Sequence, residues 1–272
     1  QLEELVLKSY YNAGLNINRC SALGNLLESG VWKLKKLRLD SNDIDDAGVA
    51  ALAHGLRSIG PSLKALGLGN NSIDSEGLSS LVAGLANCTS LERLDLSDND
   101  FSNEGLSALV EALANCTSLV WLDLSDNDFS LAAAGLGSLS KWLQTAVLNL
   151  DELRLRECGI DDEGLQALTE GATNHCKDLF LSGNDSITAS GLRYLSTSLQ
   201  SESCRLEKLH IGSINIGDDG AEVLARGLIC NKSLRCLPLH VDVENEDEIA
   251  ITPAGCTLVQ SPFKLTYRFT IS

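Results

Sequence analysis

The stretch LERLDLSDNDFSNEGLSALVEALANCTS, residues 91–118, is followed at once by LVWLDLSDNDFSLAAAGLGSL, residues 119–139. The stretch before them, LKALGLGNNSIDSEGLSSLVAGLANCTS at residues 63–90, has the same plan. All three open with the pattern L-x-x-L-x-L-x-x-N, at a spacing of 28 residues. A fixed period of this length predicts a solenoid, in which each unit packs only on its neighbours.

The same opening recurs along most of the chain. The openings lie at Leu2, Leu34, Leu63, Leu91, Leu119, Leu150, Cys176, Leu206 and Leu234. Each x-L-x-L segment alternates as a strand does, and leucines at helical spacing follow it, as in Leu106, Leu109 and Leu113. We therefore predict an α/β solenoid of about nine repeats over residues 1–241. Its parallel β-sheet lines the concave face of a horseshoe arc, and its helices cover the convex face.

An asparagine closes most of the predicted strands. It stands at Asn42, Asn71, Asn99, Asn127 and Asn184, whereas Cys158 and Ile214 replace it in two units. Its amide can satisfy backbone groups of the turning chain, so stacked units should form an asparagine ladder. After Pro238 the pattern decays, and residues 242–272 are predicted to form either an atypical C-terminal cap or a disordered tail. Alternation over Lys264–Ile271 suits one closing strand.

The charge balance restricts the kinds of partner. The formal net charge is −16, which argues against nucleic acid and anionic membranes and is compatible with a basic protein partner. Many acids also stand where helices are predicted to begin, as in Asp45-Asp46, where carboxylates complement the helix dipole. No apolar run reaches the length of a membrane span. The chain has no Met and begins at Gln1, which indicates a fragment or a processed product.

The nine cysteines are too sparse for a disulfide scaffold, and we expect reduced, packed thiols. Cys88, Cys116 and Cys230 hold the same place after the predicted helix, where a buried turn is expected. Five N-x-S/T sequons would matter only in a secreted protein. They lie at Asn70, Asn87, Asn115, Asn184 and Asn231.

The phrase LDLSDNDFSNEGLSALVEALANCTSL resembles the ribonuclease-inhibitor-like class of leucine-rich repeats. The resemblance covers about residues 2–241. Members of that class include ribonuclease inhibitor, the sensor arms of NOD-like receptors, the C-terminal region of tropomodulin and the Ran GTPase-activating protein. The resemblance implies a horseshoe fold that binds proteins, usually in the cytoplasm.

Motifs for catalysis or cofactors are lacking in the sequence. There is no P-loop, dinucleotide loop, H-E-x-x-H or paired C-x-x-C, so we predict a protein that is not an enzyme and needs no cofactor. His210, Cys236 and His240 fall on neighbouring predicted strands and could converge on a metal. Scattered surface residues are the better interpretation, and no metal site is predicted.

The outward strand positions on the concave face are the predicted binding site. Exposed aromatic side chains flanked by Arg and Asp resemble the hot spots of protein interfaces. Trp121 is expected to be exposed, beside Asp95 and Asp123 and facing Arg154. The full set of predicted partner-binding residues is Arg38, Arg93, Asp95, Trp121, Asp123, Arg154, Arg156, Phe180, Lys208 and His210.

Three hypotheses on function follow. The first is a non-enzymatic protein-binding scaffold that is cytoplasmic and monomeric in isolation. The second is a GTPase-activating protein of the Ran type, which the acidic stretch 242–248 faintly suggests, although no catalytic loop matches. The third is the ligand-sensing arm of a NOD-like receptor, which has the same physical basis as the first.

Overall fold

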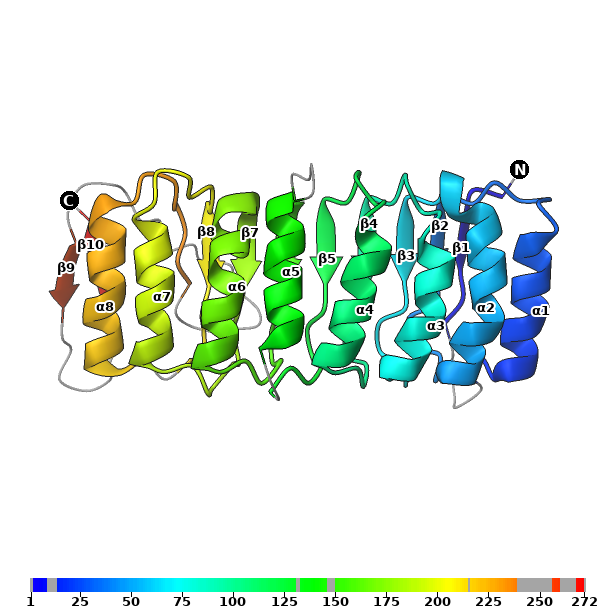
Figure 1. Cartoon of the computed structure of the whole chain (residues 1–272), viewed down its shortest axis with the longest axis horizontal. Helices are drawn as coiled ribbons and strands as arrows, with labels where there is room; N and C mark the ends of the chain where they lie inside the picture. The colour runs from blue at the N-terminus through cyan, green and yellow to red at the C-terminus, as the bar shows by residue number, and fades with distance from the viewer. Residues whose placement is uncertain are drawn as a thin grey trace.

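Strands and helices alternate along the chain and stack side by side into one elongated body (Figure 1). The computed structural model describes residues 2–8, 14–130, 133–145, 150–214, 216–238, 256–259 and 268–271. The strands of the main sheet are β1 (Glu4–Val6), β2 (Lys36–Arg38), β3 (Ala65–Gly67), β4 (Arg93–Asp95), β5 (Trp121–Asp123), β6 (Leu150–Arg154), β7 (Cys176–Phe180) and β8 (Lys208–His210). The helices are α1 (Ile17–Glu28), α2 (Asp46–Ile59), α3 (Ser75–Leu85), α4 (Asn103–Leu113), α5 (Ala134–Thr145), α6 (Asp162–His175), α7 (Ala189–Leu199) and α8 (Gly217–Cys230), with a short 3-10 turn at Gly60–Ser62.

The main sheet is parallel and follows the order of the chain from β1 to β8. Equivalent residues of successive units face one another, so that Leu66 lies opposite Leu94 and Leu94 opposite Leu122. The helices form a second layer that covers one face of this sheet (Figure 1). We call the other face concave, because a helix is wider than a strand and the stack must curve toward the sheet. The predicted α/β solenoid and its strand register are confirmed.

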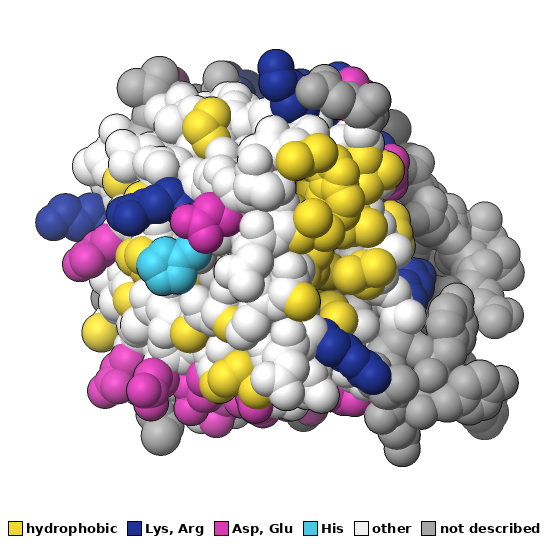
Figure 2. Space-filling model, turned by 90° about the vertical axis from the view of Figure 1, so that its right-hand side faces the viewer, with side chains coloured by type: hydrophobic (Ala, Val, Ile, Leu, Met, Phe, Trp, Pro, Cys, Tyr) yellow, Lys and Arg dark blue, Asp and Glu magenta, His cyan; other side chains and the backbone are white. Residues whose placement is uncertain are grey.

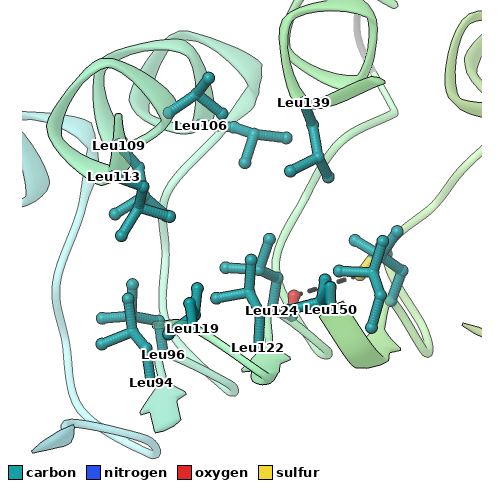
Figure 3. Packing of buried hydrophobic residues seen from close by; sticks show 14 of the residues in the cluster. Leu94, Leu96, Leu106, Leu109, Leu113, Leu119, Leu122, Leu124, Leu139 and Leu150 are labelled. Carbon is teal, nitrogen blue, oxygen red and sulfur yellow. Dashed lines mark hydrogen bonds between the residues drawn. The ribbon is translucent and has the colours of Figure 1, made fainter. Parts of the chain in front are cut away.

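The core runs between the two layers as a continuous stack of leucines. Leu94 and Leu96 from the strand side and Leu106 and Leu109 from α4 are fully buried. Figure 3 shows these side chains pointing toward one another, with those of the next unit directly beside them. Burial of this kind stabilises by roughly 1.5–3 kcal/mol for each leucine. The predicted alternation, with leucines inward, is therefore correct.

The asparagine ladder is present, and Asn71 illustrates it. Its Oδ1 accepts hydrogen bonds from the backbone N–H of Asn42 (3.1 Å) and Ile44 (2.9 Å) in the preceding unit. Its Nδ2 donates to the carbonyls of Leu39 (3.1 Å) and Leu68 (2.9 Å). Each ladder amide thus joins two units through buried hydrogen bonds.

Cys158 replaces the donor half of a ladder amide. Its Sγ donates to the carbonyls of Leu124 (3.3 Å) and Arg156 (3.2 Å), and burial raises the pKa of the thiol far above its usual value. The thiol therefore keeps the proton that it donates. A thiol accepts hydrogen bonds poorly, and the N–H of Phe129 instead donates to the backbone carbonyl of Cys158 (2.8 Å).

Side-chain oxygens start most of the helices. Asp45 accepts from the N–H of Gly48 (2.8 Å) at the start of α2, and Asp161 accepts from Gly164 (2.8 Å) at the start of α6. Asp74, Ser102 and Thr188 cap α3, α4 and α7 in the same way. Carboxylates at the predicted helix starts, those of Asp45, Asp74 and Asp161, therefore cap helices.

Two local predictions change at the end of the array. Cys230 is exposed rather than buried, because α8 continues through this position, whereas α3 and α4 end before Cys88 and Cys116. Eight strand-and-helix units lie in the described part of the chain, and the ninth opening adds only an isolated bridge between Cys236 and Lys208.

The predicted closing strand over Lys264–Ile271 is present in part. Its second half is β10 (Arg268–Ile271), which lies antiparallel to β9 (Cys256–Val259) in a separate two-stranded sheet. The remainder of residues 242–272 lies outside the described residues. Within the described part of the chain, no helix is long and apolar enough to cross a bilayer.

Candidate functional site

The outward positions of β4 to β8 form rows across the concave face. The register places Arg93, Trp121, Glu152, Asp178 and Lys208 in one row. The next row contains Asp95, Asp123, Arg154, Phe180 and His210, and Arg156 follows two residues after Arg154. Eight of the ten predicted partner-binding residues thus lie on five adjacent strands, and Arg156 lies just after one of them. Arg38 stands apart on β2, with the glycine-containing β3 between.

Six of these residues form one stacked group, which we call the arginine–aromatic cluster. Its members are Arg93, Trp121, Arg154, Arg156, Phe180 and His210.

The Trp121 ring lies at the centre of the first part of the cluster. The guanidinium carbon of Arg93 lies 4.2 Å from the ring centroid, and that of Arg154 lies 5.4 Å from it. Both are within the range of cation–π attraction. Trp121 is half-buried rather than fully exposed, because its two arginine neighbours cover part of it. The expectation that it faces Arg154 is confirmed.

The Phe180 ring extends the cluster toward β8. Arg154 and Arg156 approach its centroid at 4.9 Å and 5.0 Å, and the His210 ring stacks on it with centroids 3.8 Å apart and planes inclined by 9°. Arg154 therefore joins the two aromatic rings. Among the described residues, Nε of Arg156 and Nε2 of His210 are buried without a hydrogen-bond partner. Stacking, more than hydrogen bonding, fixes the side chains at this end of the cluster.

Ion pairs are distributed unevenly over the site. Arg154 pairs with Glu152 and lies 3.8 Å from Asp123, and Lys208 lies 3.6 Å from Asp178. Arg93 and Arg156 make no ion pair within 4.0 Å to any residue that the structure describes. Their guanidinium groups are held in place by the rings but keep donors for an acidic group of a partner.

His210 is held in its neutral form. Burial lowers its pKa to about 4, and the positive charges of Arg156, Lys208 and Arg154 act in the same direction. The His210 ring stacks on Phe180, and Cys236 is buried. Both side chains therefore have a structural role. His240, the third residue of the weighed metal constellation, lies outside the described residues. In the part of the chain that is described, no group of three or more His, Cys, Asp or Glu residues could hold a metal ion.

Asp123 departs from the predicted exposure. It points to the outward side of β5 but is only 7% exposed, because Arg154 lies beside it and Ser125 donates its backbone N–H to Oδ1 (3.0 Å). Burial raises the pKa of Asp123. Asp95 is half-buried and accepts from the N–H (3.1 Å) and hydroxyl (2.7 Å) of Ser97. The carboxylates of Asp95 and Asp123 are therefore engaged by neighbouring residues of the chain more than they are presented to solvent.

An acidic groove borders the cluster where β4, β5 and β6 end, and sequence reasoning missed it. Its volume is about 550 Å³, and its carboxylates are Asp98, Asp100, Asp126, Asp128 and Glu157. Burial raises the pKa of Asp126, and the charges of Glu157 and Asp98 raise it further. The sequence carries a signal for it, because acids flank the ladder asparagine in two successive S-D-N-D runs, at residues 97–100 and 125–128.

The repeat pattern matches a family of known proteins. A family model described as "Leucine Rich repeat" matches residues 33–53, 61–82, 87–110, 148–168 and 202–225. The chain belongs to the leucine-rich repeat family. The matched stretches cover strand-and-helix units of the sheet described above, and proteins of this family are typically scaffolds that bind other proteins.

One known relative of this leucine-rich repeat chain is a mouse protein, "NACHT, LRR and PYD domains-containing protein 14". It is 29% identical over 115 residues, which is 42% of this chain but 11% of the mouse protein. The repeats therefore resemble those of NOD-like receptors, and the chain spans about a tenth of that relative's length.

Two solved structures resemble the repeat array more loosely. The tropomodulin C-terminal domain of Caenorhabditis elegans is 15% identical, with a TM-score of 0.45 over 57% of this chain and 90% of that one. Leiomodin-1 Actin-Binding Site 2 is also 15% identical, with a TM-score of 0.42 over 52% of this chain and 79% of that one.

Proposed function

We propose that this leucine-rich repeat chain is a non-enzymatic scaffold that binds a protein partner across the concave face of β4 to β8. The arginine–aromatic cluster carries the proposal. It gathers residue types that dominate protein interfaces into one continuous group on a rigid parallel sheet.

Preorganisation supports this assignment. Trp121 and Phe180 are each stacked against two guanidinium groups, so their side chains lose little conformational freedom on binding. Arg93 is exposed and, among the described residues, has no acidic neighbour within ion-pair distance. A partner gains the attraction of such groups without having to order them first.

The character of the partner is part of the proposal. The net charge of −16 and the acidic groove beside the cluster favour a partner that carries basic groups toward that edge. Its acidic groups would be directed to Arg93 and Arg156. We place this interaction in the cytoplasm, because the repeats resemble those of NOD-like receptors and several cysteines are buried thiols without a disulfide, namely Cys20, Cys88, Cys116, Cys158 and Cys176.

Affinity capture with matched variants tests the proposal. The immobilised chain is exposed to an extract of the source organism, and the recovered proteins are compared with those held by Trp121→Ala and Arg154→Ala. Loss of a central anchor should weaken a specific partner by roughly 30-fold, equal to about 2 kcal/mol. Tyr194→Ala is the matched control, since Tyr194 is an exposed aromatic residue of α7 on the convex side.

The outcomes separate clearly. A partner lost with both cluster variants and kept by Tyr194→Ala supports the concave site, and recovery that falls with added salt supports a basic partner. Unchanged recovery with both cluster variants would remove these residues from the binding surface.

A further inference from the structure

A second, smaller cavity lies beside the arginine–aromatic cluster, after the ends of β6, β7 and β8. Its volume is about 260 Å³. The residues that line it, which define what we call the Arg156 cavity, are Arg156, Glu157, Ser182, Gly183, Asp185 and Ser213. Backbone hydrogen bonds from Glu157 to Ser182 (3.0 Å) and from Gly183 to Gly212 (3.0 Å) join the three units that contribute. The stacking of the repeats therefore fixes the shape of the cavity.

Arg156 brings unused hydrogen-bond donors to this cavity. Its guanidinium is held over the Phe180 ring, 5.0 Å from the centroid, and its Nε is buried without a hydrogen-bond partner. Within the described part of the chain, the side chain of Arg156 makes no ion pair within 4.0 Å. A guanidinium presents its N–H groups as a planar fork that matches the two oxygens of a carboxylate. Stacking thus positions the fork and leaves its terminal nitrogens for a ligand.

Ser182 supplies a second unused donor to the same cavity. The residue is only 7% exposed, and its hydroxyl makes no hydrogen bond to any residue that the structure describes. The equivalent hydroxyls of earlier units are occupied, since Ser97 donates to Asp95 (2.7 Å) and Ser125 accepts from the N–H of Arg156 (3.2 Å). Buried polar side chains are nearly always hydrogen-bonded. The unpartnered Ser182 hydroxyl therefore points to a ligand that accepts its proton.

Positive charge gathers around this end of the cluster, although the chain carries a net charge of −16. His210 reports on it. Burial is the largest cause that lowers its pKa to about 4, and the charges of Arg156, Lys208 and Arg154 lower it further. Glu152 opposes them with a smaller effect. An anionic group beside Arg156 is therefore attracted by its surroundings.

The acids at the cavity limit the charge of that anionic group. Glu157 and Asp185 line the cavity and are exposed, so solvent screens them. A singly charged carboxylate meets less repulsion from them than a doubly charged phosphate does. Glu157 also lines the acidic groove, where burial and then the charge of Glu157 raise the pKa of Asp126. A site for an anion and a site for a cation thus meet at Glu157.

We propose that the Arg156 cavity binds a carboxylate side chain of the protein partner, and that a basic side chain of the same segment lies against Glu157 in the acidic groove. The carboxylate accepts hydrogen bonds from Arg156 and from the hydroxyl of Ser182. This inference rests on the proposed function, because the segment belongs to the partner that binds the concave face. It adds the order of charges, with the basic side chain toward β5 and the acidic one toward β7.

The spacing of the two side chains follows from the sheet. From β5 to β7 there are two strand spacings, which together measure about 10 Å. Three residues of an extended segment span the same distance. The partner segment should therefore carry an acidic and a basic side chain three positions apart.

Short capped peptides test this charge order on the full 272-residue chain. The probe is acetyl-EGGK-amide, and acetyl-KGGE-amide covers the opposite chain direction. Figure 2 shows a contiguous area of hydrophobic side chains at the α1 end of the array, so the probes contain no apolar side chain that can adhere there. Chemical-shift changes at Ser182 and Gly183 in NMR spectra measure binding. The better probe should bind with a Kd on the order of 1 mM.

Matched changes in the peptide and in the protein identify the subsite. Replacing the glutamate of the probe by glutamine should weaken binding by about tenfold, because charge-assisted hydrogen bonds are lost. Arg156→Gln should weaken the glutamate probe equally and abolish its advantage over the glutamine probe. Ser182→Ala should weaken it by about threefold.

Two control variants make the same changes outside the cavity. Arg38→Gln removes a positive charge from β2, and Ser97→Ala removes the equivalent hydroxyl of an earlier unit. Both should leave the Kd of the peptide unchanged. Unchanged melting temperatures of all variants exclude a folding defect as the cause.

Three results would overturn the proposal. The first is the absence of binding of either probe up to about 10 mM, or equal affinity of the glutamate and glutamine probes. The second is an equal loss of affinity with Arg156→Gln and Arg38→Gln, which would ascribe binding to overall charge. The third is tighter binding when phosphoserine replaces the glutamate, which would assign the cavity to a phosphorylated segment.

The affinity capture described above fails separately from this test. A partner that is lost with Trp121→Ala but kept by Arg156→Gln and Ser182→Ala would retain the concave scaffold and refute the carboxylate subsite. If no captured protein depends on Trp121 or Arg154, the proposed function fails, and the peptides alone then decide whether the cavity selects a carboxylate.

Discussion

The residues on the two sides of each strand recur from unit to unit to very different degrees. The inward position at the centre of every strand of the main sheet is leucine, and ladder positions are asparagine in most units. The outward row at the same level changes from Arg93 to Trp121 to Glu152 to Asp178. An inward side chain must fit the copies before and after it, whereas an outward one meets only its row neighbours and solvent. Stability therefore depends mainly on one side of the sheet, and the residues on the other side can vary from unit to unit.

The largest contrast is expected between neighbours on β4 and its extension. Leu96→Ala empties a fully buried site and should lower the free energy of unfolding by about 2–5 kcal/mol. Asp95→Ala, on the opposite side, removes two hydrogen bonds at a half-buried position and should cost only about 0.5–1 kcal/mol. Urea unfolding followed by circular dichroism measures both. Equal losses would contradict the separation of stability and recognition.

The ladder offers a sharper comparison between two of its own members. Asn184→Ala removes the acceptor for the backbone N–H groups of Cys158 and Ile160, and also the donors to two carbonyls, all of them buried. We expect a loss of about 2–3 kcal/mol. Cys158→Ala removes only two weak thiol hydrogen bonds and should cost about 1 kcal/mol. A larger loss of unfolding free energy for Cys158→Ala than for Asn184→Ala would refute the interpretation that Cys158 replaces only the donor half of a ladder amide.

These contrasts separate the features that could be predicted from the sequence from those that could not. The inward leucines were predictable from a two-residue alternation that recurs along the chain, and the ladder asparagines from their fixed place three residues after the second inward leucine of most units. Their register followed from the repeat itself. The position of Trp121 was predictable for the same reason, but its stacking between Arg93 and Arg154 depends on side-chain rotamers on three strands.

What the sequence did not predict has a common physical cause. The burial of Asp123 arises from Arg154, which lies one strand away and 31 residues later in the chain. The acidic groove gathers carboxylates from three successive turns. Cys230 is exposed because one helix is longer than its counterparts. In each case the deciding neighbour belongs to a different unit, or the unit departs from the average repeat.

The helix layer extends the comparison to glycines that differ in their surroundings. A Cβ at Gly171 in α6 would lie 2.3 Å from the carbonyl oxygen of Ser140 and 2.6 Å from its Cα, so Gly171→Ala should cost about 1–3 kcal/mol. Gly137 in α5 has no atom nearer than 3.9 Å to such a Cβ. Gly137→Ala should therefore stabilise by about 0.5–1 kcal/mol through helix propensity. Thermal unfolding gives both values, and two changes of the same sign would contradict the packing described.

The smallest expected effect lies at the acidic groove, on the outward side. The pKa of Asp126 is raised in the folded chain by burial and by the carboxylates of Glu157 and Asp98. The folded state thus holds this proton to a higher pH than the unfolded state does, and stability falls as pH rises through the raised pKa. Asp126→Asn removes that loss. We expect a gain of only about 0.5 kcal/mol at pH 7, because Asp126 is only partly buried and solvent screens its charge.

Acid and salt separate this electrostatic gain from a conformational one. Asp126 has φ of 57°, a left-handed conformation that Asn also accepts, and any benefit from that source does not depend on pH. The gain should vanish below about pH 4, where the carboxyl is protonated in both states, and it should shrink in 1 M salt. Urea unfolding of both proteins at pH 3.5 and pH 7 gives the difference. A gain that stays constant across these conditions would show that the acidic groove carries no repulsion for a basic partner to relieve.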